Sequence, residues 1–142
     1  MSLSHDNKET IIGLDYGLTN TGVALSIDGV VSPLKIINSK NFNHFQSELS
    51  KLILNYRAKK IIVGLPLSHD GKENKQSIIV RQVINNLKKY IKIPFIYVNE
   101  YGTTQSFLSN GIISQASRKV RNKQNDSHSA ALIIENYFDS LN

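Results

Sequence analysis

A short apolar run that ends in a carboxylate and a glycine turn constrains this chain more than any other stretch. Residues 11–17 read Ile-Ile-Gly-Leu-Asp-Tyr-Gly, and a second apolar run begins at Gly22. The β-branched content and short length of the first run predict a buried strand. Asp15 would then lie at the rim of a sheet, where a carboxylate needs a cation, a donor or water. In the alternative, this Asp and its glycine simply form a capped turn.

Two further strands are predicted directly after this run. Residues 22–27 and 30–37 are expected to form a hairpin, because Asp28-Gly29 favours a two-residue turn. Pro33 lies early in the second strand and cannot donate a ladder hydrogen bond, which predicts an edge or a bulge there. Three antiparallel strands therefore come first.

The rest of the chain alternates between helical and strand patterns. We expect a helix over 41–56, a strand over 61–66, a helix over 73–90, a strand over 94–98, a short helix over 103–108, a basic loop over 114–125 and a last helix from Asp126. The predicted buried face of the second helix is Ile78, Ile79, Val83, Ile84 and Leu87. A strand, a helix and a strand in succession predict a parallel pairing.

Length and charge narrow the class of protein. The 142 residues are expected to form one domain, 1–142, with residues 1–9 as a flexible leader. The chain has no cysteine, no apolar signal region and no membrane-spanning stretch, so a cytoplasmic protein without a membrane partner is predicted. The net charge of +6 favours a polyanionic partner such as nucleic acid, although a lysine-rich genome would give the same balance.

Three acidic residues lie at the ends of predicted elements. Asp15 ends the first strand, Glu100 follows the last strand, and Asp126 begins the final helix. If the first strand is central, Asp15 and Glu100 emerge at the same edge of the sheet, and Asp126 can reach it. Clustered carboxylates repel one another without a cation, and Mg²⁺ or Mn²⁺ prefers such oxygen ligands. Asp126 could instead only cap its helix.

The sequence motifs resemble the YqgF family over nearly the whole chain. The matching stretches are 12–17 with 22–24, 62–67 with Asp70-Gly71, 98–101 with Thr103-Thr104, and Asp126-Ser127 with Ala130-Ala131, Ile134 and Tyr137. That family comprises Holliday-junction-resolvase-like proteins assigned as pre-16S rRNA processing nucleases. The resemblance implies an α/β, RNase H-like fold with a five-stranded mixed sheet in the order 3-2-1-4-5. It also implies metal-dependent cleavage of nucleic acid in the cytoplasm, with Asp15, Glu100 and Asp126 as catalytic and metal-binding positions.

Two departures from the family pattern bear on activity. The family usually reads Asp-Glu-Arg where this chain has Asn99, Glu100 and Tyr101, so one acid and one guanidinium are lost. The family often has a basic residue in the first glycine turn, whereas residues 18–21 are uncharged here. Asn99 could still coordinate through its amide oxygen. Cations for phosphate contacts are expected from Lys72, Arg118, Lys119, Arg121 and Lys123.

Two histidines are auxiliary candidates for the same site. His69 follows the fourth predicted strand, and His128 lies two residues after Asp126. Either imidazole could contact substrate or transfer a proton. Each could equally be a surface histidine without such a role.

Three functions remain open from the residues. The first is a nuclease acting on pre-rRNA or branched DNA, as a monomer or weak homodimer. The second is a nucleic-acid-binding module of the same fold whose catalysis is weakened at Asn99 and Tyr101. The third is a sugar-kinase or actin-like nucleotide binder, because a strand followed by Asp-x-Gly also forms phosphate loops; the chain has room for only one of the two domains that such proteins need.

Overall fold

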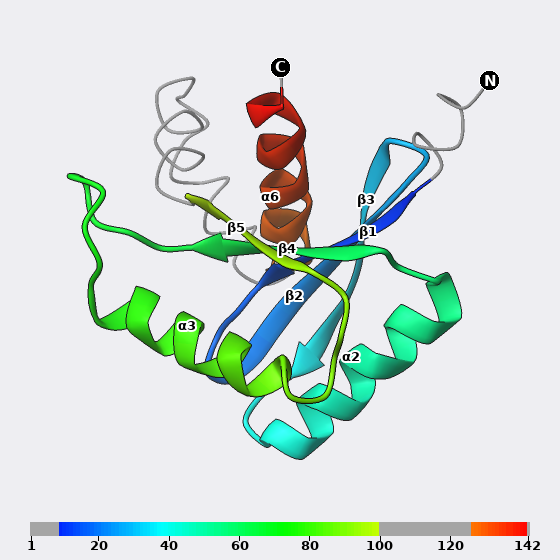
Figure 1. Cartoon of the computed structure of the whole chain (residues 1–142), viewed down its shortest axis with the longest axis horizontal. Coiled ribbons are helices and arrows are strands. Elements are labelled where there is room, and N and C mark those ends of the chain that lie inside the picture. The colour runs from blue at the N-terminus through cyan, green and yellow to red at the C-terminus, as the bar shows by residue number, and fades with distance from the viewer. Residues whose placement is uncertain (1–8, 100–125, 142) are drawn as a thin grey trace, which may run out of the picture.

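A computed structural model of the chain describes residues 9–99 and 126–141, and these residues build one five-stranded sheet with helices on both faces (Figure 1). The strands are β1 (Thr10–Asp15), β2 (Asn20–Ile27), β3 (Val30–Asn38), β4 (Lys60–Leu65) and β5 (Phe95–Asn99). The helices are α2 (Phe42–Tyr56), α3 (Lys75–Leu87) and α6 (Asp126–Ser140). The strand order β3-β2-β1-β4-β5 confirms the predicted topology.

β1 is the central strand of the sheet. It pairs antiparallel with β2, from Thr10↔Ile27 to Asp15↔Gly22, and parallel with β4, from Ile11↔Lys60 to Leu14↔Val63. β4 in turn pairs parallel with β5. The carboxyl ends of β1, β4 and β5 therefore meet at one rim of the sheet, which we call the acidic rim because Asp15 ends β1 and Glu100 follows β5 in the sequence.

β3 is an edge strand with an irregular register. Val23 pairs with Lys35 but Ala24 pairs with Pro33, so the pairing skips Leu34. Pro33 thus lies both on an edge and beside a bulge, where its missing N–H costs least. The edge prediction and the bulge prediction are both confirmed.

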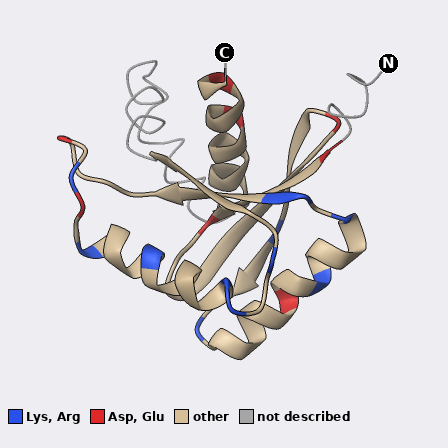
Figure 2. Cartoon of the chain, in the orientation of Figure 1, with Lys and Arg blue, Asp and Glu red and all other residues tan. Residues whose placement is uncertain are grey.

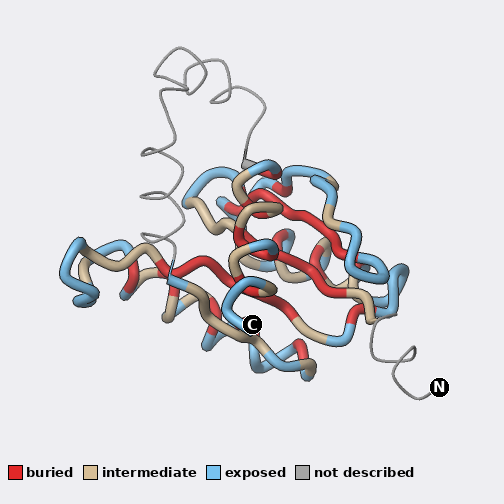
Figure 3. Tube along the Cα trace, turned by 90° about the horizontal axis from the view of Figure 1, so that it is seen from above, coloured by how far each residue is buried: buried red, intermediate tan, exposed pale blue. Residues whose placement is uncertain are grey.

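One face of the sheet packs against α2 and α3. Phe45 and Leu49 of α2 and Ile84 and Leu87 of α3 are almost fully buried against alternate residues of the sheet. Those sheet residues are Ile12, Leu14, Ile61, Val63 and Leu65. Figure 3 shows the buried segments running through the middle of the molecule, with exposed residues outside them.

The opposite face of the sheet is covered by α6. Ile11 and Ile62 pack with Ile133 and Tyr137 of α6, and Ala24 packs with Ala130 and Ile134. Because side chains alternate along a strand, odd-numbered positions of β1 and even-numbered positions of β4 and β5 face α6. This alternation decides which rim residues share a face.

The predicted helix over 73–90 is too long, and part of its buried face is wrong. The helix begins after Asn74, whose side chain accepts a hydrogen bond from the Ser77 N–H at 2.9 Å, and its residues end at Leu87. Ile78 is 48% exposed, while Ser77 and Val80 are buried. The cap fixes where the first turn starts, and packing against the sheet buries the stripe of Ser77, Val80, Ile84 and Leu87.

Several predicted segments lie outside the described residues. They are the leader over 1–8, the helix over 103–108 and the basic loop over 114–125. Glu9, which was assigned to the leader, forms an ion pair with Lys60 at 3.4 Å and so belongs to the folded part. Within residues 9–99 and 126–141, no helix has the length and apolar character needed to cross a membrane.

Candidate active site

Asp15 is the last residue of the central strand, and it belongs to the face of the sheet that α6 covers. Ile11 and Gly13 precede it on the same side of β1, and both meet residues of α6. Asp15 itself is half-buried. The carboxylate predicted from the sequence as a rigid rim residue is therefore on the acidic rim, on the α6 face.

Glycine occupies the sheet positions on both sides of Asp15. Gly22 pairs with Asp15 across β2, and Gly64 of β4 is the next position after the Leu14↔Val63 pair. Neither neighbouring strand therefore brings a side chain to this row. A glycine inside a strand often marks a place where a ligand or another backbone approaches closely.

Gly13 brings α6 unusually close to the central strand. A Cβ atom at this position would lie 2.5 Å from Ile134 Cγ1 and 2.8 Å from the carbonyl oxygen of Ala130. The helix runs opposite to the strand, because Ile11 packs with Tyr137 whereas Gly13 meets Ala130. One further turn of the helix leads back to Asp126, so α6 begins near the level of Asp15 on the same face.

The third acidic position, Glu100, immediately follows β5 but lies outside the described residues, as does the side chain of Asp126. Asn99 is described, and it falls in line with Phe95 and Tyr97, which pack on the α2–α3 face. Val98 packs on the α6 face. The alternation of β5 therefore assigns Asn99 to the face opposite Asp15.

The other predicted site residues are only partly described. His69 and Lys72 are exposed in the loop between β4 and α3, where Lys72 Nζ lies 3.9 Å from Asp70. His128 is exposed on the first turn of α6. Arg118, Lys119, Arg121 and Lys123 lie outside the described residues. Within the described part of the chain, no three His, Asp or Glu side chains are grouped closely enough to hold a metal ion.

The turn after Asp15 is held in place by hydrogen bonds from the next strands. Ser39 Oγ donates to the Gly17 carbonyl at 2.6 Å, and the Ser39 N–H donates to the Thr19 carbonyl at 2.8 Å. The Gly17 N–H donates to Thr21 Oγ1 at 3.3 Å. Only glycine fits at Gly17, since a Cβ there would lie 2.4 Å from the Asn20 carbonyl oxygen.

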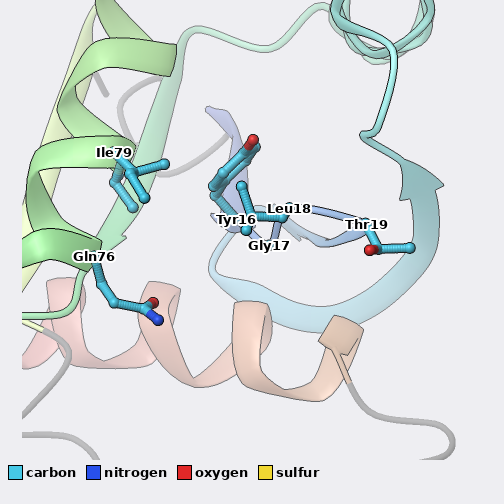
Figure 4. A pocket seen from close by; sticks show the side chains of 7 residues that line it. Tyr16, Gly17, Leu18, Thr19, Gln76 and Ile79 are labelled. Carbon is cyan, nitrogen blue, oxygen red and sulfur yellow. The ribbon is translucent and has the colours of Figure 1, made fainter.

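A pocket of about 290 Å³ opens beside this turn, on the α2–α3 side (Figure 4). The turn contributes one wall, and Gln76 and Ile79 reach toward it from α3. The lining residues are Tyr16, Gly17, Leu18, Thr19, Gln76, Ile79 and Val80. The sequence patterns did not single out Gln76 or Ser39. The uncharged character of residues 18–21 was the one sequence feature that set this turn apart.

Arg81 of α3 is paired with Glu73, which lies just before the helix. Arg81 donates to both carboxylate oxygens of Glu73, at 3.0 and 2.8 Å, and its guanidinium lies 4.9 Å from the centre of the Tyr97 ring. The hydrogen bonds from Arg81 and then from Ser77 lower the pKa of Glu73. Lysine and arginine are spread along α2, α3 and the loops at their ends (Figure 2).

The fold is that of the RuvC-type, RNase H-like resolvases. Two structures of RuvC from Thermus thermophilus match with TM-scores of 0.58 and 0.55, at 11% identity, and one of them is a complex with a Holliday junction substrate. They cover 93% and 92% of this chain, which covers 96% of each. At this identity the likeness concerns the fold alone.

The chain belongs to the RuvX family. The family model, described as Holliday junction resolvase, matches residues 9–140, and the resemblance to the YqgF family is thereby confirmed. Relatives named "Putative pre-16S rRNA nuclease" include those of Sulfurihydrogenibium sp., 36% identical, and Mycoplasma mobile, 33% identical. These alignments cover 92% and 91% of this chain, and 90% and 91% of the relatives. Membership in this family separates the chain from the kinase-like alternative.

Proposed function

We propose that this protein hydrolyses phosphodiester bonds in nucleic acid and that Asp15, Glu100 and Asp126 hold the Mg²⁺ or Mn²⁺ that the reaction needs. The observation that carries the proposal is the position of Asp15. It ends the central strand on the α6 face, between two glycine positions, and α6 begins near its level with Asp126. Family membership supports the same assignment.

The donor set fits a hard divalent cation. All three residues offer carboxylate oxygens, and the chain contains no cysteine that would favour a softer metal. A bound cation of this kind activates water and stabilises the charge that develops on the leaving oxygen. The protein's own part is to fix Asp15 on a paired strand and to leave the neighbouring positions without side chains.

The position of Asn99 supports catalysis over the binding-only alternative. The alternation of β5 assigns Asn99 to the face opposite Asp15. An Asp at this position would therefore not join the Asp15 cluster either. The departure from the family pattern then has little effect on metal binding. The double variant Asn99→Asp, Tyr101→Arg tests this directly. Its cleavage rate is expected to stay near that of the wild type, whereas a strong increase would favour the binding-only alternative.

Precursor 16S ribosomal RNA is the proposed substrate, because the relatives carry that name. A four-way DNA junction is the second candidate, favoured by the description of the family model. We expect the protein to act in the cytoplasm.

The test compares Asp15→Asn with Asp28→Asn, which removes the same charge from an exposed hairpin turn. Cleavage of a labelled pre-16S rRNA fragment and of a four-way junction is measured with saturating Mn²⁺ and with EDTA. Asp15→Asn is expected to lose more than the roughly 10–100-fold caused by removing an outer-sphere partner, while Asp28→Asn stays near wild type. Cleavage of neither substrate by the wild type, or full activity in Asp15→Asn, would overturn the proposal.

A further inference from the structure

The pocket beside the turn 16–19 has no role in the metal chemistry described above. It begins one residue after Asp15, yet it opens toward α3, whereas Asp15 belongs to the α6 face. The rim of β1 therefore separates two sites, an acidic position on one face and a pocket on the other.

The lining of the pocket favours a neutral ligand. None of the seven lining residues is charged. Burial raises the pKa of the Tyr16 phenol, which keeps it protonated. Leu18, Ile79 and Val80 provide apolar surface, while the Gln76 amide and the Thr19 hydroxyl both donate and accept hydrogen bonds. This combination suits a neutral, partly apolar group with polar edges.

The size and rigidity of the pocket narrow the ligand further. A volume of about 290 Å³ lies just below the ~300 Å³ at which small-molecule sites start. A single ring system therefore fits better than a whole nucleotide. The wall formed by the turn is fixed by the two hydrogen bonds from Ser39. Leu18 is 67% exposed at the mouth, where it can contact a group that enters.

We propose that this pocket holds one unpaired nucleobase of the substrate strand, next to the phosphate that lies at Asp15. The inference rests on the proposed nuclease function and extends it to the form of the substrate. A strand crossing the rim of β1 would place its phosphate on the α6 face and an adjacent base on the α3 face. A base can enter only when it is unstacked, so single-stranded or branched nucleic acid is bound in preference to continuous duplex.

Binding is measured with the full-length protein by fluorescence anisotropy in EDTA, so that the readout does not depend on cleavage. The probes are a fluorescein-labelled single-stranded RNA and a series in which each member carries one abasic residue. One abasic position is expected to weaken wild-type binding by about 10-fold, the size of the effect of losing one stacked base. Gln76→Trp, which fills the pocket, is expected to bind the whole series with equal affinity.

Gln76→Ala and Gln82→Ala form a matched pair. Both glutamines are exposed on α3, but only Gln76 lines the pocket. Gln76→Ala is expected to lose most of the sensitivity to the abasic position, and Gln82→Ala to keep the wild-type profile. Equal wild-type affinity across the series, or an unchanged sensitive position in Gln76→Trp, would overturn the inference.

The failure of this inference is distinguishable from the failure of the nuclease proposal. A protein that cleaves in Mn²⁺ but shows a flat abasic profile is a nuclease without a base pocket. A protein that cleaves neither substrate, but whose binding is weakened at one abasic position in a way that depends on Gln76, has the pocket without the proposed activity.

Discussion

At the scale of single residues, the hydrogen atom that Gly13 has in place of a side chain lets α6 approach the central strand. The nearest α6 atoms to a Cβ here would be Ile134 Cγ1 and the Ala130 carbonyl oxygen. The side chain could adjust, but the carbonyl belongs to the helix backbone. Gly13 thus sets the distance between the strand that carries Asp15 and the helix that carries Asp126.

Gly13→Ala is therefore expected to lower the free energy of unfolding by about 1–3 kcal/mol, the usual cost of overpacking. Nuclease activity should fall as well, because α6 must shift. Adding Ile134→Ala is expected to leave the defect, since the clash with the Ala130 carbonyl remains. Urea unfolding measures the change, with Ser32→Ala on the exposed edge strand as control. A Gly13→Ala protein as stable as wild type would contradict this account.

At the scale of elements, Asn74 joins the start of α3 to the loop after β4. Its side chain accepts from the Ser77 N–H, and its amide nitrogen donates to the Pro66 carbonyl at 2.8 Å and to Ser68 Oγ at 3.1 Å. The cap thereby also fixes where Gln76 and Ile79 stand relative to the turn after Asp15.

Asn74→Ala is expected to lower the free energy of unfolding by about 1–2 kcal/mol, at the upper end for an N-cap because the loop contacts are lost too. Asn85→Ala, at an exposed position in the same helix, is the matched control and should cost nothing, since Ala is the better helix former. The measurement is the urea midpoint of each variant. Equal effects of the two changes would show that the cap does not hold this end of the helix.

The ion pair between Glu73 and Arg81 predicts a pH dependence of stability. The folded-state pKa of Glu73 lies below its ordinary value of 4.5, through hydrogen bonds from Arg81 and Ser77. A lowered carboxyl pKa contributes stability that is present above the unfolded pKa and is lost as the pH falls through the folded one.

The difference in thermal midpoint between wild type and Glu73→Gln should therefore be constant at neutral pH and shrink in acid. Asn85→Ala, an exposed change on α3 that involves no titratable group, serves as control and should show no such trend. A difference that stays constant throughout the acid range would exclude Glu73 as the titrating group.

At the scale of the whole molecule, the net charge of +6 predicts binding of nucleic acid that weakens steeply with salt. Changing Arg118, Lys119, Arg121 and Lys123 to Ala lowers the formal charge from +6 to +2. The slope of log affinity against log salt should decrease by about one for each phosphate contact removed. Fluorescence anisotropy over a salt series measures it.

The matched control removes four charges from the opposite rim of the sheet. Lys59 precedes β4, and Lys88, Lys89 and Lys92 lie between α3 and β5, away from Asp15. Changing these four to Ala gives the same net charge and should reduce the slope less. Equal slopes would mean that net charge, not position, governs binding.

The expected oligomeric state, a monomer or weak homodimer, and the expected single domain stay predictions.

The local patterns of the sequence were sufficient for most of the fold. The Asp28-Gly29 turn, Pro33 and the β-branched runs encode short-range preferences, so the hairpin, the edge strand and the central strand followed from them. The buried face of α3 was harder, because Ile78 and Val80 differ little in chemistry. The cap at Asn74 and the packing against the sheet decided between them.

By itself, the sequence determined that Asp15 ends a buried strand, because a carboxylate between an apolar run and a glycine turn lies where the buried strand ends. Only the tertiary structure decided that Asp15 belongs to the α6 face, that the alternation of β5 assigns Asn99 to the other face, and that Gln76 meets the turn to form a pocket. Strand pairing and helix packing join residues far apart in the chain, and no local pattern encodes those distances.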